Sequence, residues 1–220
     1  MFETLKKIRK SEFVIIGGYA VNAYTLPRFS VDCDIVIKNY KELEKIIASL
    51  FNRGYKKSTI SPETPYEGKF ERYEKEISID FKVSMDILIG GVFDRQTNAK
   101  FSADWVFENS KPRELKGKTI GEKLKIRIIN PEALLVMKML SSRLTDIRDI
   151  FLLISSAKDK EWIKKEISGR YNFQNRLSKA IKEISTKQFK DSLQRVFGLI
   201  DDKTFEKHKK LLIELESPTP

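Results

Sequence analysis

The sequence predicts an α+β fold in which a mixed-sheet domain, residues 1–130, precedes a helical domain, residues 131–220. Up to residue 130, short apolar and β-branched runs alternate with segments of helical spacing, as expected for strands packed against helices. Beyond residue 130, apolar residues recur at helical spacing to about residue 215. This change of pattern places the domain boundary near Asn130.

The first domain is expected to begin with a short helix and a buried strand. Residues 2–10 have apolar side chains at helical spacing. Residues 13–18 form an apolar run that ends in paired glycines, which predicts a short strand followed by a tight turn. Residues 19–26 return to helical spacing and stop before Pro27, because proline interrupts a helix.

Two strands and one helix are expected next. Residues 31–38 and the longer run 77–91 are rich in β-forming residues, so both are expected to be strands. Between them, residues 40–53 have the apolar stripe of an amphipathic helix. Residues 58–76 contain two prolines and many charges, which predicts a loop or an irregular hairpin.

The last part of the first domain, residues 94–129, is expected to add further strands, with a turn at residues 116–118. Asn130 and Pro131 then have the residue types of a helix N-cap and of the first helical position. The helical domain is therefore expected to begin at Pro131.

The chain of 220 residues carries a formal net charge of +11, and its sequence pI is about 9.5. A basic balance favours an anionic partner such as a nucleotide or RNA, and it is also compatible with a solvated surface rich in lysine and glutamate. No apolar run approaches the roughly 20 residues of a membrane-spanning helix, and the N-terminus lacks the apolar core of a secretion signal. The single cysteine, Cys33, excludes an internal disulfide. These features predict a cytoplasmic protein.

The paired glycines Gly17 and Gly18 are the first candidates for a functional site. They lie where the predicted strand turns into a helix. Glycine lets the backbone approach a phosphate closely, and a helix N-terminus presents free N–H groups to that phosphate. Paired glycines after a strand are also common in turns that bind no ligand.

Asp32 and Asp34 are the second candidates. Residues two apart on a strand face the same side of a sheet, so the two carboxylates stand side by side while Cys33 points into the core. Adjacent carboxylates repel each other unless a cation neutralises them, and hard oxygen ligands favour Mg²⁺ or Mn²⁺. The alternative is a pair of exposed acids on an edge strand.

Asp86 is the third candidate, because an acid within an apolar strand needs a partner that offsets its desolvation. Asp80, six residues earlier, lies on the same face of the predicted strand and is a rival for this role. We prefer Asp86 because its immediate neighbours are more apolar, as expected in a central strand. A surface acid at the rim of a sheet is the alternative.

Together these features resemble the active-site signature of the DNA polymerase beta-like nucleotidyltransferase superfamily. That signature is a glycine pair at a strand–helix turn, two aspartates one residue apart, and a third acid on a later strand. The run RFSVDCD, residues 28–34, is similar to the R-x-T-x-D-x-D form of the minimal and AbiEii-like nucleotidyltransferases, a branch that includes toxins and abortive-infection proteins. Ser30 stands where that form has threonine.

The resemblance extends into the helical domain and covers about residues 13–155. Lys138 resembles the lysine on the first C-terminal helix of this branch, and Asp146 and Asp149 resemble its Asp-x-x-Asp-Ile element. We expect these two aspartates to pair with nearby cations such as Arg143, and not to bind a metal.

The resemblance implies a mixed-sheet nucleotidyltransferase domain and a metal-dependent reaction. Asp32 and Asp34 would hold two divalent ions, Mg²⁺ or Mn²⁺, and Asp86 would share one of them and could act as the general base. The reaction would transfer a nucleoside monophosphate from a nucleoside triphosphate, such as ATP, to a hydroxyl and release pyrophosphate.

The same resemblance implies a nucleotide site. It would be formed by Gly17, Gly18, Arg28, Ser30 and Lys138, with the glycines near the triphosphate and the two cations at its phosphates. Outside this set, the chain has one histidine, which is expected on the surface of a charged helix, and its cysteine is expected to be buried and inert.

Three functional readings follow. In the first, the acceptor is RNA, notably the 3′ end of tRNA, and its alternative is a small molecule or a protein side chain. In the second, the fold is a nucleotide- or RNA-binding module without catalysis. In the third, the enzyme is a toxin that a separate antitoxin protein or an inhibitory modification controls.

Overall fold

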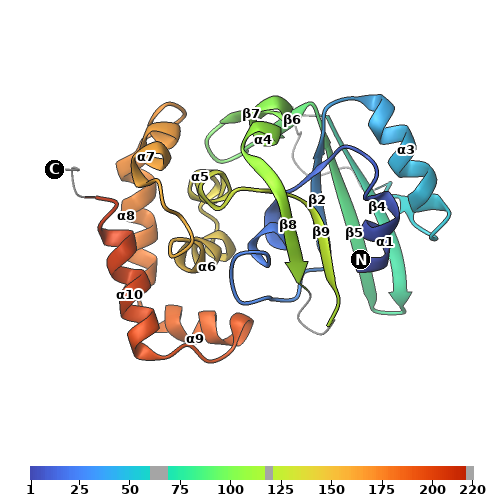
Figure 1. Cartoon of the computed structure of the whole chain (residues 1–220). Helices are drawn as coiled ribbons and strands as arrows, with labels where there is room; N and C mark the ends of the chain where they lie inside the picture. The colour runs from blue at the N-terminus through green and yellow to red at the C-terminus, as the bar shows by residue number, and fades with distance from the viewer. Residues whose placement is uncertain (60–68, 117–120, 217–220) are drawn as a thin grey trace. The chain divides into compact units, whose positions relative to one another are not determined.

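The computed structural model describes residues 1–59, 69–116 and 121–216 and confirms the α+β class, with a mixed sheet followed by helices (Figure 1). The chain forms two compact units. The first comprises residues 1–23, 29–93 and 100–130, and the second comprises residues 24–28, 94–99 and 131–220. None of the helices in the described part of the chain combines the length and the apolar character needed to cross a membrane.

The first unit is built on a mixed sheet of seven described strands in the order β3-β4-β5-β2-β1-β9-β8. These strands are β1 (Val14–Ile15), β2 (Asp32–Ile37), β3 (Lys56–Lys57), β4 (Lys69–Ser78), β5 (Phe81–Ile89), β8 (Ser110–Lys116) and β9 (Lys123–Ile129). A separate antiparallel pair is formed by β6 (Gly91–Phe93) and β7 (Lys100–Ser102). β2 and β5 are parallel neighbours at the centre of the sheet.

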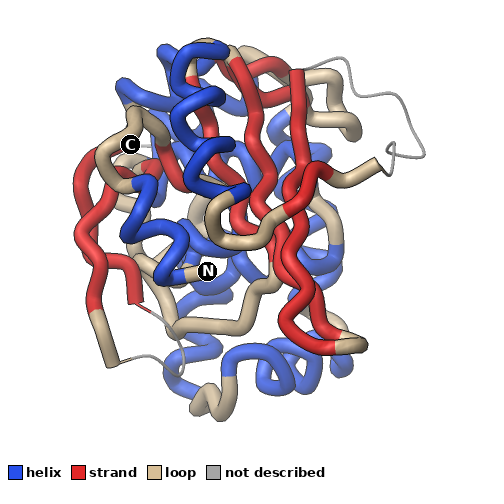
Figure 2. Tube along the Cα trace, turned by 90° about the vertical axis from the view of Figure 1, so that its right-hand side faces the viewer, coloured by secondary structure: helices blue, strands red, loops and turns tan. Residues whose placement is uncertain are grey.

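Helices α1 (Phe2–Ile8) and α3 (Tyr40–Phe51) cover one face of the sheet and lie in front of the strands in Figure 2. α3 begins where the Asn39 side chain accepts a hydrogen bond from the Glu42 backbone, so its first turn is capped. Its apolar stripe is buried, and the side chains of β2 and β5 on this face are buried with it: Cys33, Ile35, Ile37, Met85, Ile87 and Ile89.

The predicted strand over residues 77–91 is wrong in one respect, because residues 79 and 80 form a turn that divides it. β4 ends at Ser78, β5 begins at Phe81, and the two strands pair antiparallel as a hairpin. β4 begins within the segment that was expected to be a loop or an irregular hairpin, and it pairs antiparallel with β3. Residues 60–68 of that segment lie outside the described residues. β4 was not recognised as a strand from the sequence because it contains many charged residues. These are tolerated there because most of its side chains are not fully buried.

Two further predictions in the first unit need correction. The helix expected over residues 19–26 is α2 (Gly17–Val21), which starts earlier and is shorter. The region expected to add further strands, residues 94–129, also holds α4 (Ala103–Glu108), whose N-cap Ser102 accepts a hydrogen bond from Trp105 N. The turn expected at residues 116–118 falls largely outside the described residues.

The second unit is helical over residues 131–216, as expected. Its helices are α5 (Pro131–Ser141), α6 (Leu144–Leu153), α7 (Lys160–Ser168), α8 (Phe173–Ile184), α9 (Lys187–Phe197) and α10 (Asp202–Ile213). Asn130 was expected to cap α5, but its Oδ1 atom is buried and makes no hydrogen bond with the described residues.

An aromatic cluster forms part of the core of the second unit. Phe151 on α6 packs against Phe189 on α9 and Phe205 on α10. His208 was expected on the surface, but it is buried beside Phe151, where its Nδ1 atom lies 3.0 Å from the Phe151 carbonyl oxygen. The helix face that carries Phe205 and Leu212 also carries His208, so the expectation failed because this face points to the core.

Candidate functional site

The two central strands of the first unit carry the three predicted acids on one face. Asp34 on β2 is the register partner of Asp86 on β5, and Asp32 is the partner of Ser84. Partners in a sheet share a face, and so do residues two apart, so Asp32, Asp34 and Asp86 all lie opposite the face that Cys33 helps to bury. The alternation read from the sequence therefore agrees with the geometry.

Asp34 fits against the turn that leads into α2. Gly17 has a φ of +63°, and a Cβ atom added there would lie 2.0 Å from Asp34 Oδ2. The backbone holds the same arrangement, because Ile16 N donates to Asp34 O at 3.0 Å. Glycine is needed at position 17 both for its backbone conformation and for the space that the carboxylate occupies.

Asp32 is held by hydroxyl groups. Ser84 Oγ donates to Asp32 Oδ1 at 2.5 Å, and Ser30 Oγ donates to the Asp32 backbone oxygen at 3.0 Å. Tyr19 on α2 donates to the Ser30 backbone oxygen at 3.3 Å. Ser30 therefore fixes the start of β2, and its predicted contact with a nucleotide stays a prediction.

Asp86 has a partner that the sequence did not reveal. Arg72 on β4 is its register partner, and the guanidinium Nε and Nη2 donate to the two carboxylate oxygens at 2.8 and 2.6 Å. The Asp86 side chain is 8% exposed and that of Arg72 is 39% exposed. Burial raises the pKa of Asp86, although Arg72 opposes this shift. We missed Arg72 because its segment was predicted to be a loop or an irregular hairpin, and that prediction assigned Arg72 no register partner.

The rival acid, Asp80, lies in the turn between β4 and β5 and not on the strand that carries Asp86. It is exposed and precedes the first strand residue, Phe81. The expectation that Asp80 shares a strand face with Asp86 is wrong, because the strand begins after it.

The donor set of this face fits a hard divalent cation such as Mg²⁺, because it consists of carboxylate oxygens from two adjacent strands. The side chains do not converge on one point, and no group of three acidic, histidine or cysteine side chains in the described residues is arranged to hold an ion. The reason is visible at Asp86, whose two oxygens both face Arg72. Asp86 would have to exchange this partner for a metal.

Two other predicted residues, Arg28 and Lys138, meet at a buried ion cluster in the second unit. Arg28 Nε and Nη2 each donate to Asp149 at 3.1 Å. Lys138 Nζ lies 3.0 Å from Asp149 and 2.7 Å from Asp146. The expected pairing of these aspartates with cations is confirmed, and Arg143 adds a further contact to Asp146 at 2.7 Å.

The charges of this cluster stabilise one another. Burial favours the neutral form of Lys138, but Asp149 and Asp146 outweigh that effect and raise the pKa of its ammonium group. Burial also opposes ionisation of Asp146, but Lys138 and Arg143 outweigh it and lower the pKa of its carboxyl. The predicted contact of Arg28 and Lys138 with phosphates stays a prediction, because both cations are already engaged with carboxylates.

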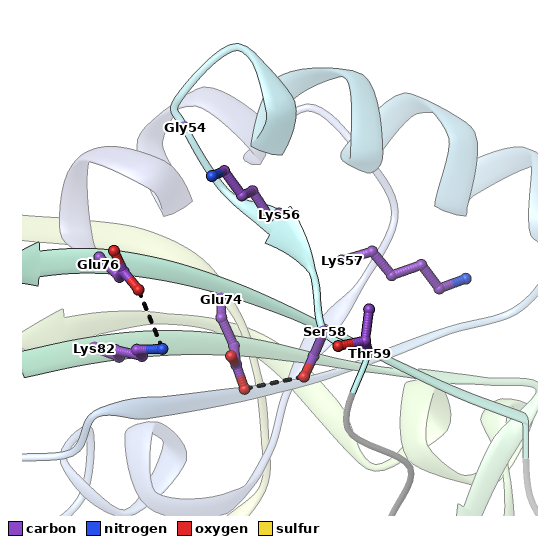
Figure 3. Close-up of a pocket in the computed structure, with 8 residues that line it drawn as sticks. All are labelled: Gly54, Lys56, Lys57, Ser58, Thr59, Glu74, Glu76 and Lys82. Carbon is purple, nitrogen blue, oxygen red and sulfur yellow. Dashed lines mark hydrogen bonds and ion pairs between the residues drawn. The ribbon is translucent and has the colours of Figure 1, made fainter.

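A pocket of about 360 Å³ lies beside β3, β4 and β5 (Figure 3). In it Ser58 and Glu74 are joined by a hydrogen bond, and Lys82 pairs with Glu76. No residue predicted for the site lines this pocket. Glu74 is the register partner of Ser84, so the pocket lies one strand away from the residue that binds Asp32.

Comparison with known proteins gave one family and several solved structures. The model of the family described as "Nucleotidyl transferase AbiEii toxin, Type IV TA system" matches residues 2–218. The structure of JHP933 from Helicobacter pylori is 14% identical, with a TM-score of 0.47 over 97% of this chain and 89% of that chain. A candidate nucleotidyltransferase from H. pylori is 15% identical, with a TM-score of 0.47 over 97% of this chain and 92% of that chain. No curated protein gave a significant match.

Proposed function

Because the chain belongs to the AbiEii nucleotidyl transferase toxin family, we propose that it transfers a nucleoside monophosphate from a nucleoside triphosphate to a hydroxyl of RNA, in particular tRNA, with Mg²⁺ or Mn²⁺ as cofactor. The chain is a nucleotidyltransferase, and its family consists of toxins of toxin–antitoxin systems, which implies a nucleotide substrate and an antitoxin partner. The metal, the acceptor and the roles of the individual residues are parts of the proposal.

The observation that carries the proposal is the shared face of Asp32, Asp34 and Asp86. Carboxylates on adjacent central strands repel one another, and a bound cation would offset this repulsion. Asp32 and Asp34 would hold two divalent ions, and Asp86 would share one of them. When bound, the ions would polarise the phosphate oxygens and stabilise the negative charge that develops during transfer.

The residues of the chain then have separate tasks. The acceptor hydroxyl oxygen attacks the α-phosphorus, the bond from that phosphorus to the bridging oxygen breaks, and pyrophosphate leaves. Asp86 accepts the hydroxyl proton. Gly17 and Gly18 let the backbone at the start of α2 approach the triphosphate, and Ser30 holds the start of β2. Arg28 and Lys138 would reach phosphates only by exchanging their carboxylate partners Asp149 and Asp146.

An RNA acceptor is supported by the basic balance of the chain, whose net charge of +11 favours polyanionic partners. A small-molecule or protein acceptor requires no such charge. Binding that weakens steeply as salt is added would support RNA, because each phosphate contact releases a counterion.

The direct experiment incubates the protein with each α-labelled nucleoside triphosphate, Mg²⁺ or Mn²⁺, and total cellular RNA, beside the variant Asp34→Asn. Label in RNA with the unaltered protein alone is the expected result. Label on a small molecule or on protein would contradict the RNA acceptor but would still support nucleotidyl transfer. Equal transfer by Asp34→Asn would reject the assigned site.

A further inference from the structure

The outer hairpin of the sheet carries a row of basic side chains that the transfer reaction does not use. Along β9 the exposed residues are Lys123, Lys125 and Arg127, and the apolar residues between them are buried. Lys116 on β8 is the register partner of Lys123 and is also exposed. We call these four residues the β9 basic strip.

The strip has more positive charge than its surroundings neutralise. Glu114 is the one acid among the register partners of the strip, and its carboxylate lies 3.3 Å from Lys123 Nζ. Lys125, directly opposite Glu114, is left with no ion pair among the described residues. Arg127 donates to Ser110 at 3.3 and 3.4 Å, through the backbone oxygen and the hydroxyl, and neither is a charged acceptor.

Protection of a sheet edge does not explain the three residues of the strip that lie on β9. Lysines on edge strands prevent pairing with other chains, and β8 is an edge strand. β9 lies inside the sheet, between β1 and β8, so its backbone is already paired. Lysine is also a poor strand former. A purely basic row on an internal strand therefore indicates an anionic partner.

The register places the strip on the face of the sheet that bears the acids. Ile15 on β1 is the partner of both Ile35 on β2 and Ile128 on β9, so these three residues share a face. Asp34 precedes Ile35 and Arg127 precedes Ile128. Because side chains alternate along a strand, Asp34 and Arg127 both lie on the opposite face. The β9 basic strip and the candidate transfer site thus lie on the same face of the sheet.

We infer that the β9 basic strip binds the phosphodiester backbone of the RNA acceptor and directs its end to the transfer site. Residues two apart on a strand are spaced by about 6.6 Å, a distance comparable with that between successive phosphates of an extended nucleic acid strand. Several cations at such a repeat fit a polyanion better than a single phosphate. This inference rests on the proposed function, because it deepens the choice of acceptor.

The test measures binding separately from catalysis. Fluorescence anisotropy with labelled unfractionated tRNA would give the dissociation constant of the unaltered protein and of Lys125→Gln/Arg127→Gln at several salt concentrations. The matched control is Lys179→Gln/Lys182→Gln, which removes two exposed charges from α8. A charge-preserving variant, Lys125→Arg/Arg127→Lys, tests whether tRNA binding depends on the positive charge alone or also on the shape of the two side chains.

The strip variant should bind tRNA at least about tenfold more weakly, with the slope of log affinity against log salt reduced by roughly 1 to 2. The control and the charge-preserving variant should stay within about threefold of the unaltered protein. Thermal unfolding would verify that each variant is folded. Equal binding by the strip variant and the control, or no tRNA binding by the unaltered protein, would overturn the inference.

Transfer assays keep this inference distinct from the proposed function. The strip variant should need more RNA for half-maximal transfer and should reach the same maximal rate. If the unaltered protein binds tRNA through the strip but transfers no nucleotide, the inference stands and the proposed reaction fails. If transfer to RNA occurs and the strip variant has an unchanged RNA requirement, the inference fails and the reaction stands.

Discussion

Gly17 leaves the space that the carboxylate of Asp34 occupies, because a Cβ atom at position 17 would lie 2.0 Å from Asp34 Oδ2. This relationship joins the strand–helix turn to the acid face of the sheet. It also explains why a glycine and an aspartate that are distant in the sequence belong to one local structure.

Replacing Gly17 with alanine should therefore destabilise the fold and displace Asp34. Alanine at a positive φ costs about 1 kcal/mol, and the collision should add roughly 1 to 3 kcal/mol. Gly54→Ala is the matched control, because Gly54 has a φ of +80° with no atom within 4 Å of an added Cβ. Urea unfolding of both variants would separate the two causes, and equal losses would contradict a close approach at Gly17.

Arg72 should stabilise the native state through Asp86. Arg72→Met leaves the buried Asp86 carboxylate without its cation, and we expect a loss of about 1 to 2 kcal/mol, since the partly exposed guanidinium is screened by water. Lys82→Met is the control, because Lys82 forms an exposed pair with Glu76 between the same two strands. The midpoints of denaturant unfolding would reveal the difference. Indistinguishable midpoints for the two variants would mean that the Arg72–Asp86 pair contributes nothing.

Lys138 should be essential to the stability of the second unit. Lys138→Met removes the cation that lies between Asp146 and Asp149, and breaking a buried pair costs about 3 to 5 kcal/mol. Thermal unfolding should show a large decrease in Tm. Lys164→Met, which removes a cation from a pair with the exposed Glu161, should leave Tm nearly unchanged. A small decrease for Lys138→Met would indicate that water or other groups replace the lysine.

His208 should make the fold sensitive to mild acid. Burial lowers its pKa from 6.5, so the unfolded chain binds the proton more readily than the folded chain. The stability from this group is therefore complete above pH 6.5 and is lost as the pH falls through the folded-state pKa. Urea unfolding across this range should show a steeper decline for the unaltered protein than for His208→Gln. Parallel pH dependences would exclude His208 as the cause.

The acids could be predicted from the sequence because strand alternation is local. Asp32 and Asp34 differ by two positions, so their shared face required no knowledge of the rest of the chain. Asp86 was chosen for its apolar neighbours and because the resembled signature has a third acid on a later strand. That its strand lies beside the strand of Asp32 and Asp34 was not predicted from the sequence. The structure supplies this relationship through the parallel pairing of β2 and β5.

Arg72, His208 and the conformation of Gly17 could not be predicted in this way. Arg72 reaches Asp86 only because β4 pairs with β5, and the many charges of β4 do not have a strand pattern. His208 is buried because neighbouring helices cover its face, which the sequence of one helix does not specify. The space at Gly17 depends on Asp34, seventeen residues away. Each of these features is set by tertiary contacts.

The central claim is that Asp86, together with Asp32 and Asp34, forms the transfer site. Its most direct test compares Asp86→Asn with Asp80→Asn in the transfer of α-labelled nucleotide to RNA, after both variants are shown to be folded. We predict that Asp86→Asn loses roughly a hundredfold or more of the rate, whereas Asp80→Asn changes it less than about twofold, because Asp80 lies in an exposed turn. A full rate for Asp86→Asn, or a loss for Asp80→Asn of the same size, would contradict the assignment.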